Sequence, residues 1–272
     1  YPGNTKRNLS FKNLNPSGSI IWIGNSDANY VHSITFRNIN LQMPSFNTTA
    51  FFAGSGSTYE QQGRVDSIYI ENIFSDKSFN AFYIYGEQNY HASNIYIDNV
   101  IIDSSAQHGI YFRDVRNSKI SRCDIRNFKA DRDAVSAGVF IHKNCRSIIV
   151  DRNKIHDLRY TGSAGYGRNG IRIQTDISSP SVKIMNNLLY NITGDGDIYA
   201  AYVMYYSPVG IYLYGYQGET SDSTIYLYNN SIYMYGNSLN TSGAYSSGIA
   251  FDLGSYGKVY NNNIVNNCGV LV

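Results

Sequence analysis

Short alternations of apolar and polar residues recur along the whole chain. In residues 94–113, Ile95 and Ile97 alternate with polar side chains, and a second alternation, Ile110-Tyr111-Phe112-Arg113, begins after Gly109. Successive side chains of a strand point to opposite faces, so these isoleucines share one interior. The segment therefore predicts two short β-strands with a common apolar face.

The same two-strand unit repeats from one end of the chain to the other. Its second half starts at a glycine in five copies, and these glycines are separated by 29, 32, 40 and 38 residues. A unit repeated every ~20 to 50 residues indicates a solenoid, a propeller or another array. Propeller blades need about four strands, and no 3.6-residue periodicity predicts helices. We therefore expect one all-β domain over residues 1–272, a single-stranded parallel β-helix (solenoid) of about eight to nine coils.

The interior of this β-helix is predicted by the apolar positions and by asparagine. The side chains expected to point inward and stack coil on coil are Ile97, Ile110, Phe112, Val139, Ile141, Ile171, Ile173, Ile211 and Leu213. Asparagine recurs at one step of the repeat, at Asn13, Asn38, Asn72, Asn99, Asn153, Asn187, Asn230 and Asn262, with Cys123 in the remaining copy. Stacked amides hydrogen-bond along a column, so Asn99, Asn153 and Asn187 should form a buried ladder. The alternative is that asparagine only marks turns.

With these repeats and this asparagine column, the chain resembles the right-handed parallel β-helix, or pectate-lyase-like, superfamily. The resemblance covers residues 8–272. The superfamily includes pectate and alginate lyases, polygalacturonases, epimerases, phage tailspikes and surface adhesins. The resemblance is specific for architecture, and the function has to be argued from individual sites.

Composition narrows the classes of partner. Charged residues make up 15% of the chain and the net charge is +2, so no bulk electrostatic field favours nucleic acid. No run approaches the ~20 apolar residues of a membrane helix. The three cysteines, Cys123, Cys145 and Cys268, have no metal-binding spacing. Five Asn-x-Ser/Thr sequons, starting at Asn8, Asn47, Asn191, Asn229 and Asn240, fit an extracellular or cell-surface protein.

The outward positions of the second strand in each unit predict a continuous wall. Successive coils contribute Tyr83 and Tyr85, Tyr111 and Arg113, Phe140 and His142, Arg172 and Gln174, Tyr212 and Tyr214, and Ala250 and Asp252. Coils about 4.8 Å apart make this wall roughly 25 Å long. Aromatic rings suit the faces of sugars, and guanidinium groups suit carboxylates or sulfates. The expected substrate-binding residues are Tyr83, Tyr85, Tyr111, Phe140, Gln174, Tyr212 and Tyr214.

The cations on this wall point to uronate chemistry. A lyase needs a base for the proton beside a carboxylate and a cation that neutralises this carboxylate. Lyases of the resembling superfamily place Lys, Arg, His or Tyr in such roles on one outer sheet. His142 or Tyr111 is the candidate base, and Arg113, Arg172 or Lys143 is the candidate neutraliser. We therefore expect a secreted protein that binds or cleaves an acidic polysaccharide.

Several alternatives stay open. Two carboxylates about 5 to 10 Å apart would support hydrolysis instead, from Asp131 and Asp133 or from Asp157 and Asp176. No cofactor is expected, although Asp131 with Asp133, and Asp195 with Asp197, are candidate oxygen ligands for calcium. Strand positions also favour tyrosine on propensity alone, so a non-catalytic adhesin or surface fibre uses the same scaffold equally well.

The two ends of the predicted solenoid carry an expectation of their own. An uncapped coil exposes unpaired backbone groups and apolar surface, which invites strand addition. We expect the chain to be part of a longer one, or its ends to contact another chain.

Overall fold

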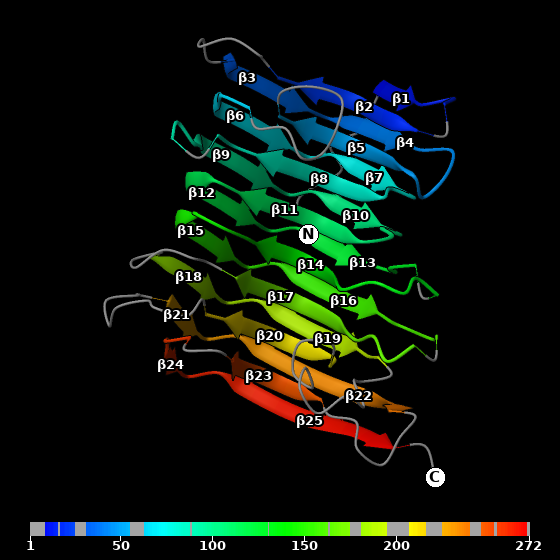
Figure 1. Ribbon diagram of the computed structural model, residues 1–272, viewed down its shortest axis with the longest axis vertical. Helices are drawn as coiled ribbons and strands as arrows, with labels where there is room; N and C mark the ends of the chain where they lie inside the picture. Colours follow the sequence, from blue (N-terminus) through cyan, green and yellow to red (C-terminus); the bar gives the residue numbers. More distant parts are fainter. Residues whose placement is uncertain are drawn as a thin grey trace.

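The computed structural model is a stack of parallel β-coils (Figure 1). It describes residues 9–15, 17–24, 31–54, 63–87, 89–129, 131–162, 164–174, 181–194, 207–215, 225–239, 246–252 and 255–270. Each coil contributes one strand to each of three sheets, named A, B and C here, and every strand pairs with the strands three places away in the chain. The expected all-β solenoid of about eight to nine coils is confirmed, since sheet A has nine described strands and sheets B and C have eight each.

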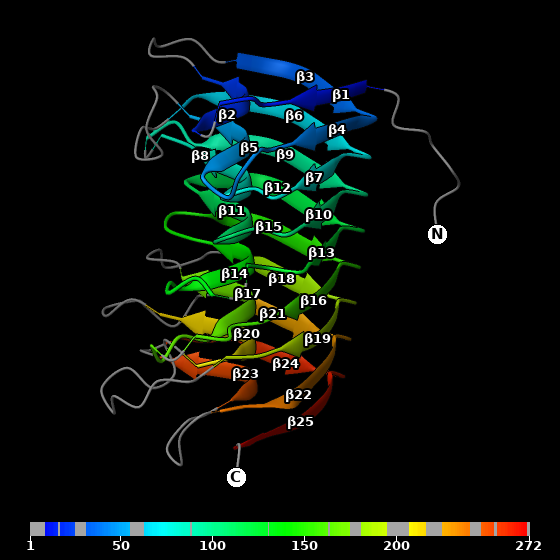
Figure 2. The same cartoon turned by 90° about the vertical axis from the view of Figure 1, so that its right-hand side faces the viewer.

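The strands are short and regular, and the three sheets run the length of the molecule (Figures 1 and 2). Sheet A contains β1 (Leu9–Lys12), β4 (Ile39–Gln42), β7 (Phe74–Asp76), β10 (Ile101–Asp103), β13 (Asp124–Arg126), β16 (Lys154–Leu158), β19 (Leu188–Ile192), β22 (Ser231–Leu239) and β25 (Asn263–Val270). Sheet B contains β2 (Gly18–Ile23), β5 (Thr48–Ala53), β8 (Asn80–Tyr85), β11 (His108–Arg113), β14 (Ser136–Ile141), β17 (Arg168–Gln174), β20 (Val209–Tyr214) and β23 (Ser247–Asp252). Sheet C contains β3 (Val31–Arg37), β6 (Val65–Glu71), β9 (Ala92–Asp98), β12 (Val115–Ser121), β15 (Arg146–Asp151), β18 (Val182–Met185), β21 (Ile225–Tyr228) and β24 (Lys258–Tyr260).

One apolar core fills the space between the sheets. All nine residues predicted to point inward are buried in it, from Ile97 in β9 to Leu213 in β20. The glycine that opens the sheet B strand is needed at the tight corner of the coil: a Cβ on Gly138 would lie 2.6 Å from Ile155 Cγ2 and 2.7 Å from the Gly170 carbonyl oxygen. In the described part of the chain, no helix has the length and apolar character needed to cross a membrane.

Asparagine occupies two different columns at the corner between sheets C and A. Asn153, Asn187, Asn230 and Asn262 lie in the inner column, where each of the first three donates from Nδ2 to the Oδ1 of the next at 2.8–2.9 Å. Asn153 Oδ1 accepts the backbone N–H of Cys123, which is buried at the same step. The inner column is thus a hydrogen-bonded amide stack.

The prediction of a buried Asn99 is wrong, because this residue lies one step earlier, in the turn. Asn38, Asn72 and Asn99 have φ of 59°, 52° and 52°, the left-handed conformation that asparagine tolerates best among residues with a Cβ. Asn99 is accordingly only half-buried, while Val100 takes the inner place and is fully buried. Turn chemistry therefore explains asparagine in the early coils, and the amide stack explains it in the later ones.

Candidate functional site

The wall predicted from the sequence lies on the outer face of sheet B, in unbroken register. Its inner row consists of Tyr83, Tyr111, Phe140, Arg172, Tyr212 and Ala250, which are paired coil to coil. Its outer row consists of Tyr85, Arg113, His142, Gln174, Tyr214 and Asp252, two residues further along each chain segment. The rings stack along the inner row, and the Tyr83 and Tyr111 centroids are 4.3 Å apart with nearly parallel planes.

Burial separates the two rows, which the sequence did not predict. Tyr111 and Phe140 of the inner row are buried outside the core in one small cluster and Tyr212 in another, and Arg172 is fully buried between Phe140 and Tyr212. In the outer row Arg113, His142, Gln174, Tyr214 and Asp252 are partly exposed, while Tyr85 is buried. A ligand therefore reaches mainly the outer row from Arg113 to Asp252, together with the partly exposed Tyr83, and the buried residues of the inner row support this surface from beneath.

Tyr111 and His142 form a hydrogen-bonded pair that joins the two rows. The Tyr111 hydroxyl lies 2.6 Å from His142 Nδ1, and Phe140 packs against both rings at centroid distances of 5.3 and 4.8 Å. Burial, together with Arg113, Lys143 and Arg172, lowers the pKa of His142 to about 3. Burial also raises the pKa of Tyr111 above its ordinary value. At neutral pH the phenol is thus protonated and the imidazole is neutral, and the tautomer of His142 decides which of the two donates in their hydrogen bond.

Arg113 is the cation of the outer row that solvent reaches. Its guanidinium carbon lies 4.5 Å from the Tyr85 ring centroid, Nε lies 3.5 Å from Asp114 Oδ2, and 31% of its side chain is exposed. Asp114 also accepts from the Asn144 side chain at 2.7 Å. Lys143, in the turn after His142, is half-buried, and its charge also acts on the His142 ring. Arg113 and Lys143 therefore place positive charge around the exposed edge of His142.

Arg172 does not occupy the position expected of a substrate-binding cation. It has no exposed surface, and its guanidinium lies between the rings of Phe140 and Tyr212, 5.3 and 4.9 Å from their centroids. Its guanidinium donates to the amide oxygens of Asn169 and Gln174 at 3.1 and 3.3 Å. Arg172 therefore does not contact a ligand directly and instead influences the site through its positive charge, which helps to lower the pKa of His142.

His108 is a member of this site that sequence reasoning missed. It precedes the corner glycine of β11, and its ring packs against Tyr111 and Phe140 at 5.6 and 5.2 Å between centroids. Nδ1 accepts the backbone N–H of Ala137 at 3.3 Å. Burial, with Arg172 as the next cause, lowers the pKa of His108 to about 3. A polar residue directly before the corner glycine was the available signal, and Asn169 shows it again in β17.

Arg168 holds the chain segment beside the wall and was also missed. This fully buried side chain donates to the backbone carbonyls of Lys129, Arg132, Ala134 and Arg159 at 2.8–3.3 Å. Burial lowers its pKa to about 10, so it stays charged at neutral pH. These hydrogen bonds from Arg168 hold the segment that carries Arg132, and the charge of Arg132 contributes to the lowered pKa of His108.

The carboxylates proposed for hydrolysis or calcium are engaged by other side chains. Asp133 accepts from the Tyr160 hydroxyl, and Asp131 is exposed and pairs with Lys129 at 3.3 Å. Asp157 accepts from His156 at 2.7 Å, and although its burial favours a higher pKa, this hydrogen bond and the one from Asn191 lower the pKa on balance. A general acid needs the opposite shift. Asp176, Asp195 and Asp197 lie outside the described residues, among which no group of three or more His, Cys, Asp or Glu side chains could hold a metal ion.

A family model described as the right-handed beta helix region matches residues 19–218, which is most of the chain. The chain belongs to the right-handed β-helix family. This assigns the handedness that the strand order alone leaves open, and the predicted right-handed parallel β-helix is confirmed. No curated protein sequence matches the chain.

Two solved structures are similar to this chain at low sequence identity. The enzymatically active domain of tailspike protein 2 from bacteriophage CBA120 has 13% identity and a TM-score of 0.48, over 89% of this chain and 37% of that one. The alginate lyase from Paenibacillus sp. str. FPU-7 has 14% identity and a TM-score of 0.48, over 94% of this chain and 90% of that one. This chain thus spans little more than a third of the tailspike domain, and likenesses at this level assign no activity.

Proposed function

We propose that this β-helix protein binds an acidic polysaccharide along the outer row of sheet B and cleaves it by β-elimination. The observation that carries the proposal is the hydrogen-bonded Tyr111–His142 pair, set among Arg113, Lys143 and Arg172. A proton-transfer pair surrounded by cations suits a substrate whose reacting carbon carries a carboxylate. An extracellular or cell-surface location fits such a substrate.

Arg113 is the residue assigned to the substrate carboxylate. Its partly exposed guanidinium can form two parallel hydrogen bonds with a planar carboxylate. When the proton beside the carboxylate leaves, negative charge builds up on the carboxylate oxygens, and a fixed cation there stabilises the transition state. Gln174 and Tyr214, the next residues of the outer row, extend the surface for further sugar units.

The Tyr111–His142 pair supplies the proton transfer. In the tautomer that carries its proton on Nδ1, His142 donates to Tyr111 Oη, and Nε2 of its partly exposed ring takes the proton from the carbon beside the carboxylate. The electrons of the broken C–H bond form the carbon–carbon double bond, and those of the broken glycosidic C–O bond leave with the oxygen. The proton held by the pair then passes to that oxygen, so no net proton is gained or lost.

The substrate itself improves this base. Burial is the largest cause of the low pKa of His142, and the cations Arg113, Lys143 and Arg172 are the next causes. A uronate bound to Arg113 offsets part of this positive charge and raises the pKa of His142 in the complex. The pair therefore becomes a better proton acceptor when the substrate is in place.

The test is an assay of the full chain on a panel of uronate polymers, followed by ultraviolet absorbance of the unsaturated chain ends. Tyr111→Phe and His142→Ala should each reduce turnover by roughly 100-fold or more, the usual contribution of a positioned acid or base. Binding of an oligouronate, measured by calorimetry, should change far less. Tyr233→Ala, at an exposed position on sheet A, is the matched control and should leave both unchanged.

Two results would redirect the assignment. Oligouronate binding without any unsaturated product would support the adhesin or fibre alternative, in which the outer row binds but does not cleave. Turnover that survives both Tyr111→Phe and His142→Ala would exclude this pair as the catalytic group.

A further inference from the structure

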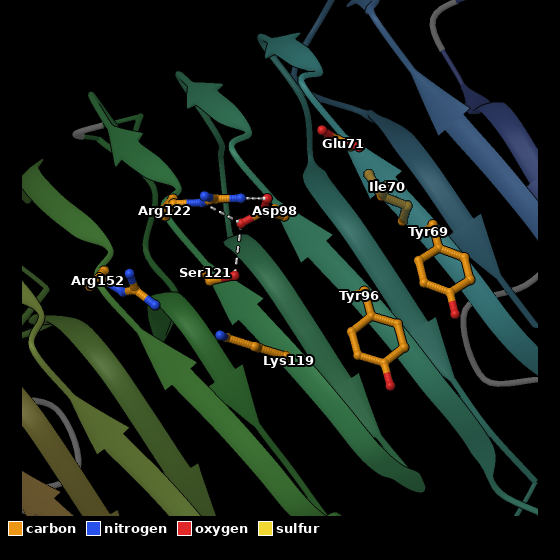
Figure 3. A pocket seen from close by; sticks show the side chains of 9 residues that line it. All are labelled: Tyr69, Ile70, Glu71, Tyr96, Asp98, Lys119, Ser121, Arg122 and Arg152. Carbon is orange, nitrogen blue, oxygen red and sulfur yellow. Dashed lines mark hydrogen bonds and ion pairs between the residues drawn. The ribbon is translucent and has the colours of Figure 1, made fainter. Parts of the chain in front are cut away.

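A second surface feature lies on the outer face of sheet C, on a different side of the solenoid from the wall. A hollow of about 330 Å³ crosses β6, β9 and β12 and reaches the turn after β15 (Figure 3). Its lining consists of Tyr69, Ile70, Glu71, Tyr96, Asp98, Lys119, Ser121, Arg122 and Arg152. The volume is at the lower end of the ~300–1,000 Å³ typical of small-ligand sites.

An aromatic pair forms one side of the hollow. Tyr69 and Tyr96 are register partners on β6 and β9, and their rings are stacked at 5.0 Å with an interplanar angle of 9°. Tyr69 is 45% exposed, so the pair presents ring edges and hydroxyls to solvent. Figure 3 shows both hydroxyls pointing the same way from the sheet. Tyrosine in this setting offers apolar contact and a hydrogen-bonding group together, which suits the mixed surface of a sugar.

A fixed array of donors and acceptors forms the other side. Arg122 donates to both oxygens of Asp98, with Nε at 2.9 Å from Oδ1, and Ser121 Oγ donates to Oδ1 at 2.8 Å. The Arg122 side chain remains 58% exposed. The outer N–H groups of Arg122 and Oδ2 of Asp98, which accepts one hydrogen bond here, therefore lie side by side, an arrangement that matches adjacent sugar hydroxyls.

Arg122 and Arg152 occupy turn positions that ordinarily belong to asparagine. Both have positive φ, 54° and 55°, at the step where Asn38, Asn72, Asn99, Asn186, Asn229 and Asn261 stand in the other described coils. This conformation disfavours arginine more than asparagine. Arginine replaces asparagine only in the two described coils that border the hollow. We therefore attribute its presence to a role of the arginine side chain in the hollow, not to the needs of the turn.

The cations around the hollow all lie in ion pairs, and two of them share one carboxylate. Arg122 pairs with Asp98, while Lys119 and Arg152 pair with Asp151 at 3.4 and 2.9 Å. Glu71 pairs in turn with Arg37 at 2.7 Å. These four cations and three carboxylates leave a net charge of +1, and a polyanion would have to compete with a carboxylate for each cation of the hollow.

We infer that this hollow is a second glycan-binding site, which takes neutral sugar units. The tyrosine pair contacts the apolar face of a sugar, and the Asp98–Arg122 pair binds its adjacent hydroxyls. The hollow lies on a different sheet from the Tyr111–His142 pair, so this proposal does not depend on the proposed lyase activity and can be tested separately.

The test is calorimetric titration of the full chain with short neutral cello-, manno- and xylo-oligosaccharides and, in parallel, with an oligogalacturonate. Arg122→Asn installs the residue that the turn prefers, so the fold should be kept or stabilised while roughly ten-fold or more in affinity for the neutral ligand is lost. Tyr96→Ala should cause a similar loss. Tyr226→Ala, in the same column of sheet C but beyond the hollow, is the matched control and should bind normally.

The binding data for each ligand either support or contradict the neutral-sugar site. Weaker neutral-sugar binding by Arg122→Asn and Tyr96→Ala, with unchanged binding by Tyr226→Ala, supports it. It is wrong if no neutral oligosaccharide of the panel binds the unaltered chain, or if one binds equally well to both hollow variants. Loss of oligogalacturonate binding in Arg122→Asn would instead assign an acidic ligand to the hollow and overturn its neutral specificity.

Discussion

Burial lowers the pKa of His142 and raises the pKa of Tyr111, so one protonation state of the pair is strongly favoured. The pKa of His142 is lowered to about 3, and that of Tyr111 is raised. Protonated tyrosine and neutral histidine is therefore the resting state over a wide range of pH. A proton on His142 is tolerated only when an anion offsets the charge of Arg113 and its neighbours.

The first prediction at this scale concerns the pH dependence of turnover. In the free protein, His142 should stay neutral far below the ordinary histidine value of about 6.5, so the acid limb of kcat/KM should fall well below pH 6.5. The acid limb of kcat, which reports the complex, should lie at higher pH because the bound carboxylate raises the pKa of His142. Steady-state rates from about pH 2.5 to about pH 8 would cover both limbs.

Folding has to be followed over the same pH range. Because the folded pKa of His142 is lowered, its stabilising contribution is complete above about pH 6.5 and decreases as the pH falls below that value. Circular dichroism at each pH separates this loss from a loss of chemistry. An acid limb of kcat/KM near pH 6.5, in a fully folded protein, would contradict the assigned environment of His142.

Single positions also show where sequence reasoning succeeds and fails. Strand alternation placed Tyr111, His142 and Arg113 on one face because side-chain direction follows from local geometry. The same pattern could not show that Arg172 is buried, because its burial depends on segments distant in sequence. His108 was missed for a related reason: a histidine before a glycine fits a turn, and only its packing against Tyr111 shows otherwise.

At the scale of elements, the asparagine columns connect each coil to the next. The side chain of Asn187 makes four hydrogen bonds: its Nδ2 donates to Val150 O and Asn230 Oδ1, and its Oδ1 accepts from the N–H and Nδ2 of Asn153. All of these groups are buried or nearly so, and removal of the amide would leave them without their partners. The column therefore fixes the height of one corner relative to the next.

The second prediction follows from this column. Asn187→Ala should lower the free energy of unfolding by about 2–5 kcal/mol, because more than one buried polar group loses its partner. Asn261→Gly is the matched control: it changes an exposed asparagine at positive φ to the residue that best tolerates this conformation, so little loss is expected. Denaturant unfolding of both variants would measure the difference, and equal stabilities would remove the energetic role of the inner column.

The two columns also explain why the sequence located the ladder only in part. The later coils carry asparagine at both steps, as in Asn186-Asn187 and Asn229-Asn230, whereas the early coils carry it only in the turn. A search for recurring asparagine cannot distinguish a residue that accepts positive φ from one that bonds to its neighbours. Only the backbone conformation of Asn99 separates the two roles.

At the scale of the whole molecule, charge is sparse and local. The net charge is +2 over 272 residues, so long-range attraction of a polyanion is weak. Binding of an acidic glycan should depend on the few cations that touch it, chiefly Arg113. This differs from a uniformly basic surface, in which many distant charges contribute.

The third prediction tests this difference. Arg113→Ala should weaken oligouronate binding by about 1.5–3 kcal/mol, the value of a charged hydrogen bond, and should flatten the salt dependence of the affinity. Arg37→Ala, which removes an exposed arginine paired with Glu71 on sheet C, keeps the same net charge as Arg113→Ala and should have little effect. Equal losses in the two variants would mean that overall charge, rather than contact, governs binding.

Constant register has a consequence for how such a molecule can change its length. Arg122 and Arg152 occupy equivalent turns one coil apart, so deletion of residues 122–151 would join Ser121 to Arg152 and recreate the junction that Ser121 makes with Arg122. Each coil contacts mainly its neighbours, so the coils on either side of the deletion would stack with their residue columns aligned. The wall would be shorter by one step of about 4.8 Å. Loss or duplication of whole coils in a gene can therefore alter, one step at a time, how many sugar units the surface accommodates without redesign of any strand.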